Sequence, residues 1–138
     1  MSLKQILTDM LIRDEGVRLK PYRCTAGKLS IGCGRNLTDV GISGDEALYL
    51  LNHDIERVEK DCAQAFDFWA TLDDSRKCVL LNMCFNLGLR GLLKFQNTLQ
   101  AVKNCEYDKA ADMMLDSKWA SQVGERAKRL AHIMRTGD

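Results

Sequence analysis

The spacing of apolar residues changes twice along this chain, and that change limits the folds that the chain can adopt. From Leu3 to Leu11 the apolar residues recur at the spacing of one helix face, and the pattern stops at Gly16, a residue type that readily ends a helix. Residues 18–37 then carry turn signals and a short alternating run, and helical spacing returns from residue 43 onward. One short alternating stretch among helical segments predicts an α+β fold that is mainly helical.

The alternating stretch predicts a small antiparallel sheet, and the remainder predicts a series of helices. Pro21 and Gly27 punctuate residues 18–37, and the run LSIGCG after Lys28 alternates as a short strand does. Ser43, followed by Gly-Asp-Glu, is a typical start for a long helix over residues 43–67. Further helices are expected over residues 75–86, 92–104, 107–115 and 125–134, with breaks near Gly88, Gly91 and Gly124.

A length of 138 residues favours one domain with one sizeable core. We expect a small β-containing lobe over about residues 14–42, joined by a connecting helix over about 43–67 to a helical lobe. The helical lobe is expected to comprise about residues 68–138 together with 1–13, because the opening helix has an apolar face to bury. A cleft between the two lobes is the natural place for a ligand.

Charge and hydropathy exclude several classes of partner. The chain has 20 basic and 19 acidic residues and a formal net charge of +1, so no overall field draws it to nucleic acid or anionic lipid. No stretch approaches the roughly 20 apolar residues of a membrane span, and the charged opening segment indicates a helix and not a signal peptide. We expect neither nucleic-acid binding nor membrane insertion, and a monomer is the default assembly.

The cysteines indicate reduced thiols, and neither they nor the histidines indicate a metal site. The cysteine spacings are irregular and the chain shows no export signal, so an even number does not predict disulfides. No Cys-x-x-Cys pair occurs, and His53 and His132 lack ligand spacing with any cysteine. We therefore expect no metal and no other cofactor. The six cysteines are Cys24, Cys33, Cys62, Cys78, Cys84 and Cys105.

The densest group of unusual residues begins where the first helix ends. Glu15 precedes Gly16 and faces the expected hairpin, which carries Cys24, Ser30 and the turn Gly32-x-Gly34. Glycosidic cleavage needs a proton donor on one side of the bond, and opposite it a group that holds water or stabilises positive charge. Spacing alone does not decide whether Glu15 is the proton donor, because a glutamate at a helix end is more often simply solvated. The turn lacks the third glycine and the lysine of nucleotide-binding loops.

The same residues resemble the phage lysozymes typified by the T-even phages. That family shows E-G, then Y-x-D, then G, then T-I-G-x-G, and this chain has Glu15-Gly16, Tyr22-Arg23-Cys24, Gly27 and Ser30-Ile31-Gly32-Cys33-Gly34. The resemblance covers nearly the whole chain, which looks shortened between Arg35 and Gly44. It continues in order through NMCFNLG (82–88), GLLKFQNTL (91–99), YDKAA (107–111), SKW (117–119) and RAKR (126–129).

The resemblance implies a lysozyme, an endolysin-type muramidase of lysozyme-like fold with a cleft between its lobes. Glu15 then protonates the glycosidic oxygen of the β-1,4 bond between N-acetylmuramic acid and N-acetylglucosamine in peptidoglycan. Arg126 is expected to pair with Glu15, and Asp14, Asn82 and Arg129 to tie the end of its helix to the large lobe. The residues expected at the glycan are Phe85, which also suits a core position, Asn86, Thr98 and Gln122.

Two departures from the family pattern affect the site. Ser30 replaces the usual threonine and keeps a hydroxyl that can orient water. Cys24 replaces the usual aspartate, and a thiol with its ordinary pKa of about 8.5 is mostly neutral at pH 7. Three interpretations of Cys24 follow. Cys24 is a partial thiolate that acts as base or nucleophile, or Glu15 and Ser30 catalyse the reaction without it. In the third, its presence indicates a catalytically impaired protein that only binds peptidoglycan.

Two further expectations follow from the resemblance. Arg35 stands where the family has a histidine paired with an aspartate of the long helix, so we expect an ion pair between Arg35 and Asp54. Without a signal peptide, the protein is expected in the host cytoplasm, reaching the cell wall after holin-type permeabilisation of the membrane.

Overall fold

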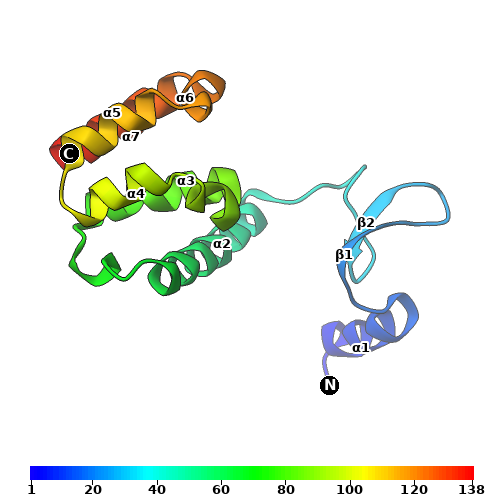
Figure 1. Cartoon of the computed structure of the whole chain (residues 1–138). Coiled ribbons are helices and arrows are strands. Elements are labelled where there is room, and N and C mark those ends of the chain that lie inside the picture. Colours follow the sequence, from blue (N-terminus) through cyan, green and yellow to red (C-terminus); the bar gives the residue numbers. More distant parts are fainter. The chain divides into compact units, whose positions relative to one another are not determined.

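The computed structural model describes all 138 residues and divides them into two compact units, Met1–Tyr49 and Leu50–Asp138, called here the small unit and the helical unit. The chain forms seven helices and a three-stranded antiparallel sheet, which confirms a mainly helical α+β fold. Figure 1 labels the helices in chain order from α1 to α7. The elements are α1 (Leu3–Glu15), β1 (Arg18–Arg23), β2 (Leu29–Gly32), β3 (Arg35–Asn36), α2 (Gly44–Ala65), a 3-10 turn (Trp69–Thr71), α3 (Asp74–Leu93), α4 (Gln96–Lys103), α5 (Tyr107–Leu115), α6 (Lys118–Val123) and α7 (Glu125–Thr136).

Helix α1 is closed at both ends by local hydrogen bonds. At its start Ser2 and Gln5 form a reciprocal capping box, in which each side chain accepts from the other residue's backbone N–H. At its end Gly16 adopts φ 72° and donates its N–H to the carbonyl of Ile12 over 2.9 Å. The predicted helix end is confirmed, and it leaves Glu15 as the last helical residue.

The sheet of the small unit has the order β1-β2-β3, and both pairings are antiparallel. Tyr22 lies opposite Ser30, and Ser30 in turn lies opposite Asn36, so Ser30 is held between two neighbouring strands. The register between β1 and β2 shifts between Arg18 and Tyr22, where the ladder is irregular. All three strands fall within residues 18–37, as the alternating pattern predicts.

The helical unit contains the apolar core. Cys62 of α2, Leu80 and Met83 of α3 and Met134 of α7 have no exposed surface. Helix α7 packs against α3, α5 and α6, and α5 also packs against α4, so the core lies among these helices. Figure 1 shows α5 and α7 side by side. The other fully enclosed large side chains are Val79, Leu92, Val102 and Met114.

The boundaries around α3 and α4 differ from those expected. Helix α3 continues past a kink at Gly88, where φ is 74°, and ends at Leu93. Helix α4 therefore begins only at Gln96, and not at residue 92 as the apolar spacing indicated. No single helix is long and apolar enough to cross a membrane, and only α3 and α4 taken together, bent by 105°, meet that length and composition.

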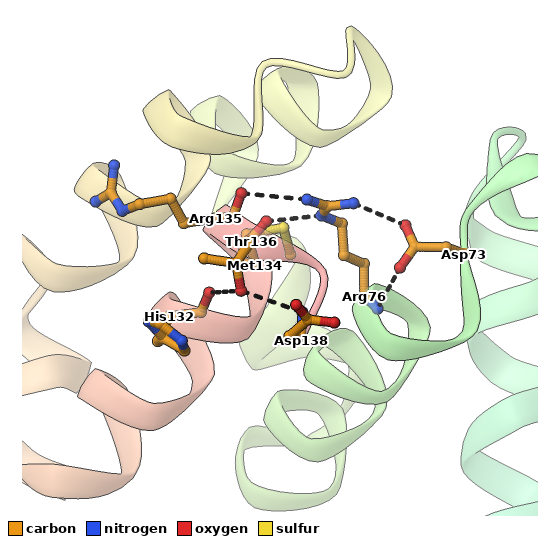
Figure 2. Close-up of polar contacts among 7 residues, drawn as sticks. All are labelled: Asp73, Arg76, His132, Met134, Arg135, Thr136 and Asp138. Carbon is orange, nitrogen blue, oxygen red and sulfur yellow. Dashed lines mark hydrogen bonds and ion pairs between the residues drawn. The ribbon is translucent and has the colours of Figure 1, made fainter.

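Arg76 of α3 closes the carboxyl end of α7 (Figure 2). Its Nε donates to the carbonyl of Met134 over 2.7 Å, and Nη2 donates to the carbonyl of Arg135 over 3.2 Å. Its Nη1 also pairs with Asp73 at 3.1 Å. Its guanidinium lies 3.6 Å from the ring centre of Tyr107. A guanidinium satisfies terminal helix carbonyls well, so Arg76 ties the last helix to α3 and α5.

Candidate active site

Glu15 presents its carboxyl to the turn between β2 and β3. As the last residue of α1 it is exposed, and the helix ends immediately afterwards at Gly16. Its carboxyl lies against Gly34, because a β-carbon built on Gly34 would come within 3.0 Å of Glu15 Oε2. The end of α1 and the β2–β3 turn therefore place a carboxylate at the edge of the sheet.

Cys24 begins the turn that joins β1 to β2. Its backbone N–H donates to the carbonyl of Lys28, and its own carbonyl accepts from Gly27, both over 2.9 Å. The backbone N–H of Ala26 and then that of Lys28 donate to the sulfur and lower the pKa of the Cys24 thiol, against a smaller opposing effect of burial. Backbone N–H groups that converge on one atom form an anion-binding nest. The turn therefore favours a thiolate at Cys24.

Ser30 places its hydroxyl beside that sulfur. The side chain is 3% exposed, in the strand between β1 and β3. Its hydroxyl is hydrogen-bonded to the Cys24 sulfur, which also lowers the pKa of the thiol. The small unit therefore holds all three residues predicted for catalysis and joins two of them, Cys24 and Ser30, directly.

The expected ion pair between Arg35 and Asp54 is wrong. Arg35 donates through Nη1 and Nη2 to the two carboxylate oxygens of Glu46, and through Nη1 to the carbonyl of Gly41 at 3.1 Å. Asp54 instead pairs with Arg57, one helical turn along α2, at 2.7 Å. Glu46 lies in the first turn of α2, where its Oε1 also accepts the Ser43 N–H over 2.9 Å.

Three of the predicted residues line one apolar groove on the helical unit. Arg126 of α7 donates through Nε and Nη2 to Asn82 Oδ1, over 2.9 and 2.7 Å. Phe85, which is 48% exposed, lies one helical turn beyond Asn82 on α3. The groove has a volume of about 340 Å³, and Leu51, Ile55, Val58, Cys78 and Leu81 complete its lining. Phe85 is thus a surface residue and not a core residue. The pairing of Arg126 with Glu15 stays a prediction.

The remaining predicted residues are spread over the two units. Asn86 accepts a hydrogen bond from the indole N–H of the buried Trp119 over 2.9 Å, which fixes its amide. Thr98 is 4% exposed in α4 and borders a polar pocket of about 370 Å³. Gln122 is exposed on α6, Arg129 is exposed on α7 beside a second apolar pocket, and Asp14 pairs with Arg13 at 3.7 Å in α1.

Sequence reasoning assigned no role to the backbone around the site. The groups that lower the Cys24 pKa are backbone N–H donors of Ala26 and Lys28, and such donors have no residue-type signal. Gly34 was noted only as half of a tight turn, although its lack of a side chain makes room for Glu15. No group of three or more His, Cys, Asp or Glu side chains is placed to hold a metal ion.

Comparisons with known proteins identify the relatives of the chain. The family model described as Phage lysozyme matches residues 13–135. Two proteins of Dictyostelium discoideum, described as Probable T4-type lysozyme 2 and 1, are 27% and 26% identical over 95% of this chain and 94% of each relative. The Pre-baseplate central spike protein Gp5 of Enterobacteria phage T4 is 29% identical over 96% of this chain, which spans 28% of the length of that spike protein.

The fold and the relatives together define the class of protein. A mainly helical chain with a small antiparallel sheet and this family match is a lysozyme-like glycoside hydrolase. The chain belongs to the phage lysozyme family, whose model covers most of its length, and the expected resemblance is therefore confirmed.

Proposed function

We propose that the chain is a muramidase that cleaves the β-1,4 bond between N-acetylmuramic acid and N-acetylglucosamine in peptidoglycan. The observation that carries this proposal is the small unit itself, which presents the Glu15 carboxyl on one turn and a hydrogen-bonded Cys24–Ser30 pair on another. A carboxylic acid and a second group able to become anionic are the two parts that glycosidic hydrolysis requires.

In the proposed reaction Glu15 is the general acid and Cys24 is the base. The Glu15 proton passes to the leaving glycosidic oxygen as the bond from that oxygen to the anomeric carbon breaks. Water attacks the anomeric carbon from the opposite face, its proton passes to the Cys24 thiolate, and Ser30 orients the water. The Ala26 and Lys28 N–H groups support this role, because they lower the pKa of the thiol and stabilise its anion.

The helical unit would bind the glycan and its peptide stems. We assign substrate contacts to Phe85, Asn86, Thr98 and Gln122. Phe85 supports this because its exposed ring beside the Asn82–Arg126 contact offers a flat apolar surface to a sugar. Asp14 pairs with Arg13 at the end of α1, and Asn82 pairs with Arg126 in the helical unit. We assign these residues and Arg129 to supporting the groups that act on the glycan.

The biological setting that we propose is lysis of a bacterial host. A monomeric enzyme would accumulate in the host cytoplasm and reach the wall after a holin-type lesion in the membrane. The similarity to a central spike protein favours a second setting, in which such a domain acts within a larger phage assembly. Light scattering of the purified protein, followed by lysis assays on cells with and without a membrane lesion, separates the two settings.

Clearing of purified peptidoglycan under reducing conditions tests the activity. We expect the wild type to clear, Glu15→Gln to be inactive and Cys24→Ala to be strongly impaired, whereas Cys24→Asp keeps activity by restoring a carboxylate. Reducing-end analysis of the products identifies which of the two alternating bonds is cut.

The same assay addresses the alternative, a peptidoglycan-binding relative without catalysis. The replacement of the family's aspartate by Cys24 is the observation that favours it. An inert wild type that still sediments with peptidoglycan, together with an active Cys24→Asp variant, would establish the alternative and exclude the muramidase.

A further inference from the structure

The Glu15 carboxyl lies in the space that a side chain at position 34 would fill. A β-carbon added to Gly34 would lie 3.0 Å from Oε2, 3.1 Å from Cδ and 3.3 Å from Cγ of Glu15. Ordinary contacts between carbon and carboxyl atoms are longer than this, so a side chain at position 34 would force the Glu15 carboxyl to move by at least a few tenths of an ångström. Among the glycines of the small unit, only Gly34 has another side chain within 4 Å of such a β-carbon.

The turn that carries Gly34 is held more firmly than the Glu15 side chain. Ile31 and Arg35 pair across the turn, and Arg35 is anchored by both oxygens of Glu46 and by the Gly41 carbonyl. The Glu15 carboxyl, in contrast, is the exposed end of a flexible side chain at the last position of α1. A new side chain at Gly34 would therefore displace the carboxyl and leave the turn in place.

We infer that Gly34 is a positioning residue for the general acid. The bare α-carbon of Gly34 forms one wall of the site that the Glu15 carboxyl occupies, and this wall limits the positions from which the carboxyl donates its proton. Proton transfer in a glycosidase depends on such placement, because a displacement of about 1 Å costs up to about a hundredfold in rate. The inference rests on the proposed role of Glu15.

Gly32, the last residue of β2 and the start of the same turn, provides a matched control. Both glycines have positive φ, 81° at Gly34 and 71° at Gly32, so alanine strains the backbone similarly at each position. A β-carbon at Gly32 meets nothing within 4 Å. The variants Gly34→Ala and Gly32→Ala therefore share the backbone strain and differ in the contact with Glu15.

Peptidoglycan hydrolysis by the full chain tests the inference. We expect Gly34→Ala to lower kcat about 5- to 10-fold with KM changed less than about twofold, since the acid is shifted by a fraction of an ångström while the glycan contacts remain. Gly32→Ala should keep kcat within about threefold of the wild type, with a similar loss of thermal stability. Equal kcat losses in the two variants, or a loss in Gly34→Ala that appears only in KM, would overturn the positioning role.

A second measurement follows the carboxyl without using activity. With carbon-13 in the glutamate carboxyls, the Glu15 resonance should move in Gly34→Ala and stay in place in Gly32→Ala. An unmoved resonance in Gly34→Ala overturns the inference even if kcat falls. An inert wild type overturns the proposed function, whereas an active wild type with equal losses in both variants overturns only the role of Gly34.

Discussion

The two units of this chain hold their side chains in different ways. In the helical unit the buried side chains between Val58 and Met134 are apolar, with the exception of Thr98. In the small unit Ser30 is the one buried side chain, and turns, capping boxes and the Arg35–Glu46 ion pair fix the backbone around it. The residues proposed for catalysis all belong to the small unit.

This difference separates the source of stability from the source of chemistry. Apolar burial supplies most of the free energy of folding, so the helical unit should determine whether the chain folds. A single hydrogen bond adds little to the free energy of folding but fixes the orientation of the groups that it joins. The small unit should therefore determine how the side chains of Glu15, Cys24 and Ser30 are oriented. Pairs of substitutions matched in residue type, two across the units and one within the helical unit, test this separation of stability from chemistry.

The cysteines should show the largest contrast. Burial first, and then the neighbouring Cys84 thiol, raises the pKa of Cys62 to about 12, whereas backbone N–H donors lower the pKa of Cys24. Iodoacetamide at pH 8 should modify Cys24 at least about a thousandfold faster than Cys62, because only the thiolate reacts. Peptide mass mapping over time measures both rates.

Activity should fall in step with the modification of Cys24. The Cys24→Ala variant is the control, because alkylation of its other cysteines should leave its residual activity unchanged. If the wild type is fully modified at Cys24 and still cleaves peptidoglycan at its original rate, the thiolate has no part in the reaction.

Leucine substitutions compare apolar packing in the two units. Leu80→Ala on α3 should lower the free energy of unfolding by about 2–5 kcal/mol, because the side chain is fully buried and leaves a cavity. Leu19→Ala on β1 should change it by less than about 0.5 kcal/mol, since Leu19 is 85% exposed. Urea denaturation followed by circular dichroism measures both. A large loss in Leu19→Ala would show that apolar packing also stabilises the small unit.

Arginine substitutions compare a partly buried and an exposed guanidinium within the helical unit. Arg76→Ala should cost about 1.5–3 kcal/mol, because two carbonyls at the end of α7 lose a charged donor. Arg57→Ala should cost less than about 0.5 kcal/mol, because its pair with Asp54 is solvent-exposed. Equal effects in thermal unfolding would mean that the Arg76 contacts add nothing to the apolar core.

The sequence predicted those parts of the fold that depend on neighbouring residues. The end of α1 at Gly16, the cap of the long helix at Ser43 and the helix over residues 107–115 all follow from local signals, and the structure contains each of them. The sequence also placed Cys24 and Ser30 on one hairpin, but the interaction between their side chains is a finding of the structure.

The parts that sequence reasoning missed depend on distant or very short segments. Helix α6 spans six residues, fewer than two turns, so its apolar spacing gives no period to detect. Arg76 meets the end of α7 across 58 positions of the chain, for which no local pattern exists. Family position suggested Asp54 as the partner of Arg35, but Arg35 binds Glu46, which the cap of α2 already holds in place.

The Arg35–Glu46 pair gives the smallest expected effect and the sharpest pH dependence. The hydrogen bonds from Arg35 first, and then that from the Ser43 N–H, lower the pKa of Glu46 from 4.5 to about 2. Because the folded-state pKa lies below the unfolded one, the stabilisation is complete above pH 4.5 and is lost as the pH falls toward about 2. Both side chains are more than a third exposed, so solvent screening keeps the contribution modest.

In the Glu46→Gln variant, β3 should therefore unfold at a slightly lower temperature than in the wild type near neutral pH. This difference in unfolding temperature should disappear at about pH 2. Thermal melts followed through the NMR signals of Arg35 and Asn36 measure this difference at a series of pH values. Glu56→Gln, on an exposed position of the same helix, is the control and should leave these signals unchanged. If the difference persists at pH 2, Glu46 stabilises the small unit through its cap on α2 and not through its charge. The polar contacts of the small unit would then act by geometry alone.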